Sequence, residues 1–217
     1  MTNDRSYAMR AACAVPLFLA GASPAFAHHV SGGETPVTFG EGLLSGLGHP
    51  VIGVDHFAFI VAVGIAAALA GRLLPLTVSF ALGALAGCLV HVAGVNLPVA
   101  ELVIAATVLL LGAIIATNRQ LPAIMLGTLF AFAGLFHGWA YGGSILGAQE
   151  MPLVAYLTGF TMIQLAIAVF AGMVTRWVMV SHPTRQMNVR LAGGVVAGMG
   201  LALFVGQIEG SLFPGVV

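Results

Sequence analysis

Residues 50–71 read PVIGVDHFAFIVAVGIAAALAG, and this stretch indicates what class of protein the chain is. Its only ionisable side chains are Asp55 and His56, which are adjacent. An apolar run of this length can cross the roughly 30 Å hydrocarbon core of a bilayer as a helix. We therefore expect residues 50–71 to form a membrane span that carries a carboxylate and an imidazole.

Five further apolar stretches follow along the chain. They cover residues 74–95, 98–117, 121–142, 152–176 and 190–210. A proline stands near the start of four of them, where a missing backbone N–H costs little. Because every stretch is long enough to span a bilayer, the pattern predicts an all-α polytopic membrane helix bundle with about six transmembrane helices.

The overall composition also indicates a membrane protein. Hydrophobic residues make up 59% of the chain, charged residues make up 6%, and the mean hydropathy is +1.05. Soluble domains carry about 25% charged residues, so most of this surface must face lipid. The chain has no lysine and no basic patch, which excludes nucleic acid as a partner. The lipid bilayer is the expected surrounding, and the sequence leaves open whether copies of the chain form a homo-oligomer.

The N-terminal residues have the pattern of a cleavable signal peptide. Arg5 and Arg10 precede a short apolar core, and an A-x-A sequence ends at Ala27. An uncleaved first helix is the alternative interpretation. With cleavage, we expect three parts: a signal peptide over residues 1–27, a periplasmic N-terminal segment over 28–47, and a six-helix transmembrane domain over 48–217.

The arginines that follow Ala27 indicate an orientation. If the mature N-terminus is periplasmic, all of them lie in cytoplasmic connections: Arg72, Arg119, Arg176, Arg185 and Arg190. The periplasmic connections then hold acidic residues and no arginine. This is the distribution that the positive-inside rule describes. We expect a multi-pass protein of the bacterial inner (plasma) membrane with both mature termini in the periplasm.

Ionisable residues inside spans are costly, so each is a candidate for function. His49, Asp55 and His56 lie at the start of the first stretch, and His137 lies near the end of the fourth. With a rise of about 1.5 Å per residue, these stretches place His56 and His137 in the outer third of the membrane. On one continuous helix, His49 and His56 would share a face, because they are seven residues apart.

Imidazole combined with carboxylate favours a borderline divalent ion such as nickel, cobalt or zinc. Asp55 could bind the ion directly, or it could hydrogen-bond an imidazole that binds the ion. For His91, a hydrogen bond between helices is the simpler interpretation. The expected ligands are His49, Asp55, His56 and His137. Further candidates for the metal site or path are His28, His29, His91 and Glu101.

The same residues resemble the signatures of a known family. The string His49-Pro50-x-x-Gly53-x-Asp55-His56, followed by Ala62-Val63-Gly64, resembles the first-span signature of the HupE/UreJ family. Phe136-His137-Gly138-x-Ala140 resembles the second signature, in the fourth span. Glu150-Met151-Pro152 and Leu97-Pro98 with Glu101 also fit. The resemblance extends over essentially the whole chain after the signal peptide.

The resemblance implies a six-span permease for nickel, and in some members cobalt, linked to the maturation of hydrogenase or urease. It places the functional positions at His49, Asp55, His56 and His137. The family usually has another histidine where this chain has Tyr141, and Gln164 replaces a histidine expected in the fifth span. Both side chains offer oxygen in place of nitrogen, which shifts the preference toward harder ions. Tyr141 and Gln164 are therefore added to the candidates for the metal site or path.

The expected function is a secondary transporter that carries nickel, or cobalt, as cargo and holds no prosthetic group. No G-x-x-x-x-G-K-[ST] motif occurs, so the energy would come from the membrane potential or from a partner. One alternative is an intramembrane metalloenzyme, because histidines and a carboxylate can hold catalytic zinc. No H-E-x-x-H motif supports it, and we do not expect an enzyme. The other alternative is a metal sensor or accessory subunit that binds metal without transporting it.

Overall fold

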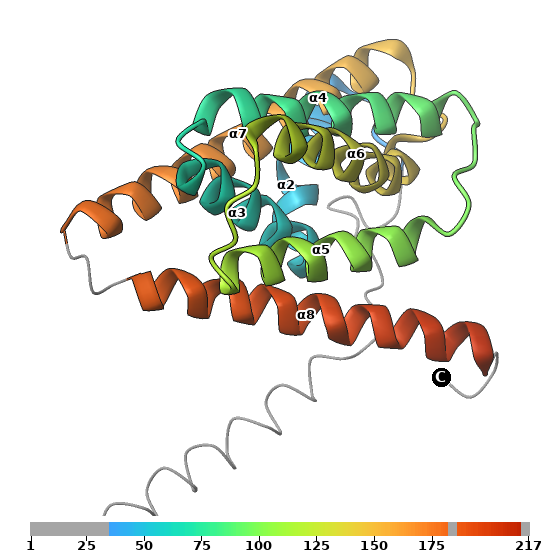
Figure 1. The fold of residues 1–217 in the computed structure, drawn as a ribbon. Coiled ribbons are helices and arrows are strands. Elements are labelled where there is room, and N and C mark those ends of the chain that lie inside the picture. The colour runs from blue at the N-terminus through green and yellow to red at the C-terminus, as the bar shows by residue number, and fades with distance from the viewer. Residues whose placement is uncertain (1–34, 182–185, 214–217) are drawn as a thin grey trace, which may run out of the picture.

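The computed structural model describes residues 35–181 and 186–213, and all regular structure in these ranges is helical (Figure 1). The elements are α2 (Phe39–Ile52), α3 (Val54–Leu69), α4 (Leu73–Val92), α5 (Ala100–Ala116), α6 (Ala123–Gly142), the short 3-10 helix η1 (Gly143–Ile145), α7 (Glu150–Ser181) and α8 (Gln186–Leu212). The all-α prediction is confirmed for this part of the chain. The predicted signal peptide and the two histidines that follow it, His28 and His29, lie outside the described residues.

All six apolar stretches predicted from the sequence form helices. Four segments are long and apolar enough to cross a membrane: Leu73–Val92, Ala123–Ile145, Glu150–Val180 and Gln186–Leu212. The pair α2 and α3 passes the same test together, which gives up to five spans. α5 is apolar but has only 17 residues, a length of about 25 Å. The chain is therefore a multi-pass membrane protein, and the sixth span stays a prediction.

The prediction of one continuous helix over residues 50–71 is wrong, because the chain breaks inside this stretch. α2 continues through Pro50 and ends at Ile52, and α3 begins at Val54 with a bend of 81°. Gly53, between the two helices, has extended backbone (φ −73°, ψ 104°). Pro50 has no N–H, so one helical hydrogen bond is missing just before the break. His49 and His56 therefore lie on different helices and do not share a helical face.

α2 begins within the segment predicted to be periplasmic. The Thr38 hydroxyl accepts a hydrogen bond from the Glu41 N–H, and the Glu41 carboxylate accepts one from the Thr38 N–H. This reciprocal capping box fixes the start of the helix. Gly42 and Gly46 are buried against α7, where a Cβ would overlap the backbone of α7. α2 is thus part of the bundle, and the predicted boundary between residues 47 and 48 falls inside it.

Small residues allow the other helices to approach closely, as is common in membranes. Between α4 and α6, a Cβ at Gly138 would overlap the carbonyl of Ala84. Between α5 and α8, a Cβ at Gly200 would overlap the backbone of Leu109. Figure 1 shows the resulting arrangement, with α4 beside α6 and with α8 along α5 on the outside of the bundle.

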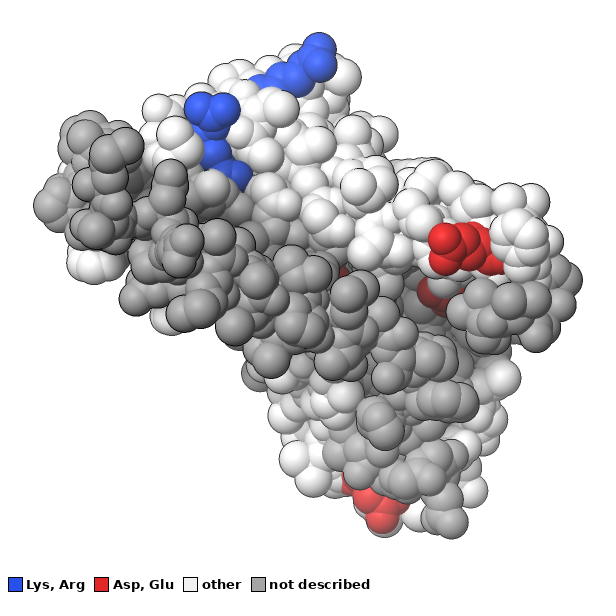
Figure 2. Space-filling model, turned by 90° about the horizontal axis from the view of Figure 1, so that it is seen from below, with Lys and Arg blue, Asp and Glu red and all other residues white. Residues whose placement is uncertain are grey.

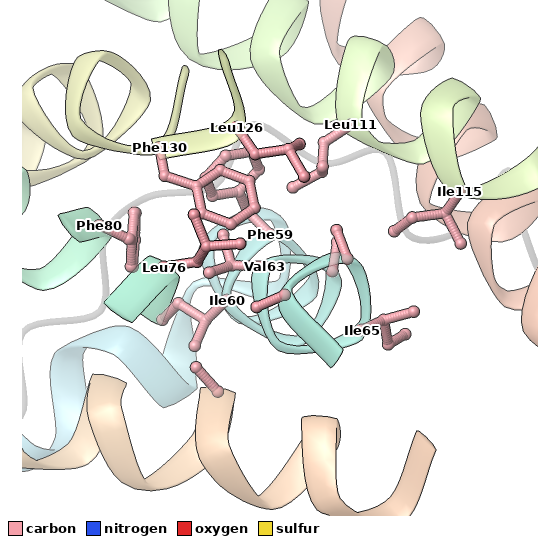
Figure 3. Close-up of a cluster of buried hydrophobic side chains, with 14 of the residues drawn as sticks. Phe59, Ile60, Val63, Ile65, Leu76, Phe80, Leu111, Ile115, Leu126 and Phe130 are labelled. Carbon is pink, nitrogen blue, oxygen red and sulfur yellow. The ribbon is translucent and has the colours of Figure 1, made fainter. Parts of the chain in front are cut away.

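α3 is at the centre of the packing. Its side chains Phe59 and Val63 are fully buried, and they meet Phe80 of α4 and Phe130 of α6 (Figure 3). The contacts of this core hold the first turn of α3, which carries the adjacent Asp55 and His56, in one position relative to α4 and α6.

The described charged side chains are separated by sign on one face of the molecule (Figure 2). On the face shown in Figure 2, basic side chains lie at one end and acidic side chains lie away from them. Most of the described surface between them carries no charge. Basic side chains gathered at one end of a membrane bundle are what the positive-inside rule describes. Which side is cytoplasmic stays a prediction.

Candidate metal site

The polar side chains gather at the break in the first apolar stretch. His49 lies in the last turn of α2, and Asp55 and His56 lie in the first turn of α3. His137 and Tyr141, one turn apart in α6, face them. The structure therefore brings the four predicted ligand residues together at the meeting point of three helices.

The His56 side chain is held by its neighbour. Nδ1 of His56 lies 2.9 Å from Oδ1 of Asp55. A carboxylate only accepts hydrogen bonds, so Nδ1 carries the proton and, in the neutral ring, Nε2 carries the lone pair. Nε2 is buried and has no hydrogen-bond partner in the structure. Of the two roles considered for Asp55, the structure shows the one in which it orients an imidazole.

His137 lies beside His56 and is 1% exposed. The two ring centroids are 5.2 Å apart, at an interplanar angle of 81°. The other face of His137 stacks on Phe59, with centroids 4.1 Å apart. Its Nε2 lies 3.1 Å from the hydroxyl of Thr107, a residue of α5. Three helices therefore contribute to this part of the cluster: α3, α5 and α6.

Tyr141 fills the space between the imidazoles. Its ring centroid is 4.5 Å from that of His56 and 5.0 Å from that of His49. The side chain is 1% exposed, and its hydroxyl has no hydrogen-bond partner in the structure. Burial of a hydroxyl without a partner costs about 1–3 kcal/mol. The hydroxyl oxygen is therefore available as a ligand to a bound species.

Two further residues hold His49 and Tyr141. The Ser144 hydroxyl, in η1, lies 2.9 Å from Nδ1 of His49. The Tyr156 hydroxyl, in α7, donates to the backbone carbonyl of Tyr141 at 3.0 Å. These contacts fix the end of α6 against α2 and α7. They also place Ser144 in the cluster beside His49.

Gln164 lies on α7 at the level of the break. One stripe of α7 meets α2 where Tyr156 faces Gly46, and it meets α3 where Ala168 faces Gly64. Gln164 is on the same stripe between these two positions, since it lies eight residues after Tyr156 and four before Ala168. It is fully buried, and its Nε2 donates to the carbonyl one turn earlier at 3.2 Å. Its Oε1 has no partner in the structure.

His91 and Glu101 lie outside the cluster. Nδ1 of His91 donates to the Trp139 carbonyl at 2.6 Å, and the two rings stack. This is the hydrogen bond between helices that the sequence suggested. Glu101 is exposed in the first turn of α5. Among the described residues, the structure shows no hydrogen bond, ion pair or ring contact of either residue with His56 or His137.

The cluster is packed and is not a preformed cage. Within residues 35–181 and 186–213, no three histidine, cysteine, aspartate or glutamate side chains are placed to hold one metal ion. The ring contacts of Tyr141 with His49 and His56 occupy the centre instead. An ion would have to separate these side chains.

Sequence reasoning missed Ser144 and Thr107. Thr107 had a detectable signal, because it is the only polar residue between Glu101 and Thr117 in an apolar stretch. Ser144 had none, since it lies in a glycine-rich connection where serine is common.

The comparisons with known proteins agree with one another. The family described as HupE / UreJ protein matches residues 16–203. Protein HupE of Rhizobium leguminosarum bv. viciae is 32% identical over 170 residues, which cover 76% of this chain and 86% of that protein. No solved structure matches.

Proposed function

The chain belongs to the HupE/UreJ family, and on this basis we propose that it is a permease for a divalent transition metal, with nickel as the first candidate and cobalt as the second. Proteins of this family are in general membrane proteins related to nickel or cobalt transport and accessory to hydrogenase or urease. The choice of metal and the transport activity itself belong to the proposal.

The observation that carries the proposal is the pairing of Asp55 with His56. The carboxylate holds the proton on Nδ1 and leaves the buried Nε2 lone pair without a partner. Histidines that bind metals usually donate their other N–H to a carboxylate or a carbonyl, which raises their basicity and fixes the ring. The His56 ring is therefore prepared to bind a metal ion before the ion arrives.

The remaining donors suit a borderline ion that loses its water in steps. His137 lies beside the ring of His56, and His49 lies beside the ring of Tyr141, which itself contacts His56. Imidazole nitrogen suits nickel and cobalt, and the Tyr141 hydroxyl would supply an oxygen. We propose that His49, His56 and His137 take the ion as its hydration shell is removed, while Asp55 orients His56. His28 and His29, at the proposed mature N-terminus, would concentrate the ion in the periplasm.

Onward passage would follow the break between α2 and α3. Carbonyls at the C-terminal end of a helix generally lack helical partners and lie at the negative end of the helix dipole, which favours a cation. Discontinuous helices with such ends form the ion sites of many secondary transporters. Gln164, with its free Oε1, lies on α7 at this level. We propose it as the next oxygen ligand along the path.

The energy for uptake would come from the membrane potential. Inward movement of one elementary charge is worth about 2.3 kcal/mol per 100 mV, so a divalent ion gains about twice that value. This fits the proposed orientation in the inner membrane, with both mature termini in the periplasm and the arginine-bearing loops in the cytoplasm.

Uptake of nickel by cells that express the full chain tests the proposal. Cells with the His56→Ala variant should accumulate no more nickel than cells without the protein. The matched control is His91→Ala, which removes a histidine that bonds Trp139 outside the cluster and should leave uptake near the original level. Equal uptake by the His56→Ala variant and the original protein, at equal abundance in the membrane, would contradict the proposed site.

A second function is supported by the packed state of the cluster. The donors are in contact and no cage is preformed among the described residues, as would also suit an accessory subunit that binds metal without moving it. The two functions differ in one measurement. Stoichiometric nickel binding by the purified protein, without flux into vesicles, would favour the accessory function.

A further inference from the structure

We propose that Thr107 is a positioning residue that fixes the tautomer of His137, so that Nδ1 of His137, and not Nε2, is the nitrogen with a lone pair that can bind a metal. The part of this inference that concerns metal rests on the proposed function. The part that concerns the tautomer does not depend on it.

The Thr107 hydroxyl has a single proton to donate. Oγ1 lies 2.7 Å from the carbonyl oxygen of Ile104 in the same helix, and it donates to that carbonyl. A carbonyl oxygen has no proton to give, so the hydroxyl proton must lie in this contact. Threonine commonly makes this back-bond to the preceding turn of a helix.

The position of this proton determines which nitrogen of the His137 ring is protonated. The Thr107 oxygen is 3.1 Å from Nε2 of His137, and its proton is already used. The oxygen can therefore only accept at this contact, so Nε2 must carry a hydrogen. In the neutral ring, Nδ1 then carries the lone pair. Both hydrogen bonds therefore point the same way: Nε2 of His137 donates to Thr107, and Thr107 donates to the carbonyl of Ile104.

The His137 ring has little freedom to turn. His137 is 1% exposed and stacks on Phe59 at an interplanar angle of 19°. Rotation of the ring by 180° would break the contact with Thr107 inside the bundle and leave a buried N–H unpaired. The packing on Phe59 and the hydrogen bond to Thr107 thus favour the same orientation of the His137 ring.

The two adjacent imidazoles are therefore prepared by different partners. Asp55 leaves the lone pair of His56 on Nε2, and Thr107 leaves the lone pair of His137 on Nδ1. Thr107 is distinguished from the other described threonines whose hydroxyls bond their own helix, such as Thr77, Thr128 and Thr175. Only Thr107 among them also meets a histidine.

The first test measures the tautomer directly in the full-length protein in detergent. Nitrogen NMR of protein labelled with ¹⁵N-histidine distinguishes a protonated from an unprotonated ring nitrogen, and a His137→Gln spectrum assigns the signals. We expect His137 to be protonated at Nε2 in the original protein and to become a mixture of tautomers in Thr107→Val. A ring protonated at Nδ1 in the original protein would overturn the inference, whether or not metal binds.

The second test measures nickel binding by calorimetry with the same proteins. Thr107→Val should weaken binding about tenfold, since loss of the partner of a ligating histidine typically costs 10–100-fold in affinity. Thr107→Ser, which keeps the hydroxyl, should restore it. Thr77→Val is the matched control, because it removes a buried back-bond of the same kind in α4 and should not change binding.

The outcomes separate the inference from the proposed function. If the original protein binds nickel and Thr107→Val binds equally well, the inference fails and the permease proposal stands. If the original protein binds no nickel, the permease proposal fails and the NMR result alone decides the role of Thr107.

Discussion

Asp55 and His56, neighbours in the first turn of α3, are joined by a contact of 2.9 Å between Oδ1 and Nδ1. Both residues lie in the first turn of α3, which begins directly after the break at Gly53. A carboxylate inside a membrane protein is costly unless it has a partner or a function. Here it has a partner, an imidazole whose second nitrogen has no hydrogen-bond partner in the structure.

We predict that Asp55→Asn weakens nickel binding by about 10–100-fold without loss of the fold. The amide can still accept a hydrogen bond from His56, but it carries no negative charge to raise the basicity of the ring. Calorimetric titration of the purified protein measures the effect. Glu101→Gln removes an exposed carboxylate outside the cluster and serves as the control. Unchanged affinity in Asp55→Asn would refute the role given to the carboxylate.

Tyr141→Phe should separate stability from metal binding. The change removes a buried hydroxyl that has no partner and keeps the ring that packs on His49 and His56. The melting temperature should therefore stay the same or rise, since no hydrogen bond is lost. Nickel affinity should fall if the hydroxyl is a ligand. A variant as stable as the original protein with full affinity would remove Tyr141 from the proposed ligands.

Gln164→Leu should keep the bundle intact and slow transport. Leucine fills a similar volume and removes a buried oxygen that lacks a partner in the structure. The expected result is slower nickel flux into vesicles with nearly unchanged binding, because the imidazole cluster is untouched. Gln207→Leu, at an exposed position of α8, is the control. Flux at the original rate would show that the path does not pass Gln164.

Gly138→Ala should destabilise the bundle by about 1–3 kcal/mol through overpacking. A Cβ at this position would overlap the backbone of Ala84, which cannot move without separating α4 from α6. Gly127→Ala, in the same helix, is the matched control. Its nearest new contact is at 3.6 Å, with the side chain of Leu76, so no loss of stability is expected. Thermal unfolding in detergent compares the two variants, and equal melting temperatures would be inconsistent with the described α4–α6 contact.

Much of the fold could be predicted from hydropathy, because an apolar stretch in lipid must satisfy its backbone hydrogen bonds as a helix. The break at Gly53 could not. Pro50 and Gly53 are equally compatible with the start of a span. The helices on both sides of the break pack on α7 through Gly46 and Gly64, and these contacts between distant parts of the chain are not visible in the sequence.

The candidate site was predicted in part. The cost of a charge in a span identified Asp55 and its neighbours, because polar residues are conspicuous in apolar sequence. Thr107 and Ser144 are small and weakly polar, so their role depends on which imidazole they meet. That depends on how α5 and η1 pack on α6 and α2, which residue spacing does not determine.

The central claim is that a divalent metal crosses the membrane past His56, and flux into proteoliposomes tests it most directly. Radiolabelled nickel and, separately, cobalt would be offered to vesicles with an imposed inside-negative potential, with the full chain or its Asp55→Asn, His56→Ala double variant. We predict flux that depends on the potential in the original protein and is absent in the double variant. Equal flux in both, or no flux in the original protein despite stoichiometric binding, would contradict the account.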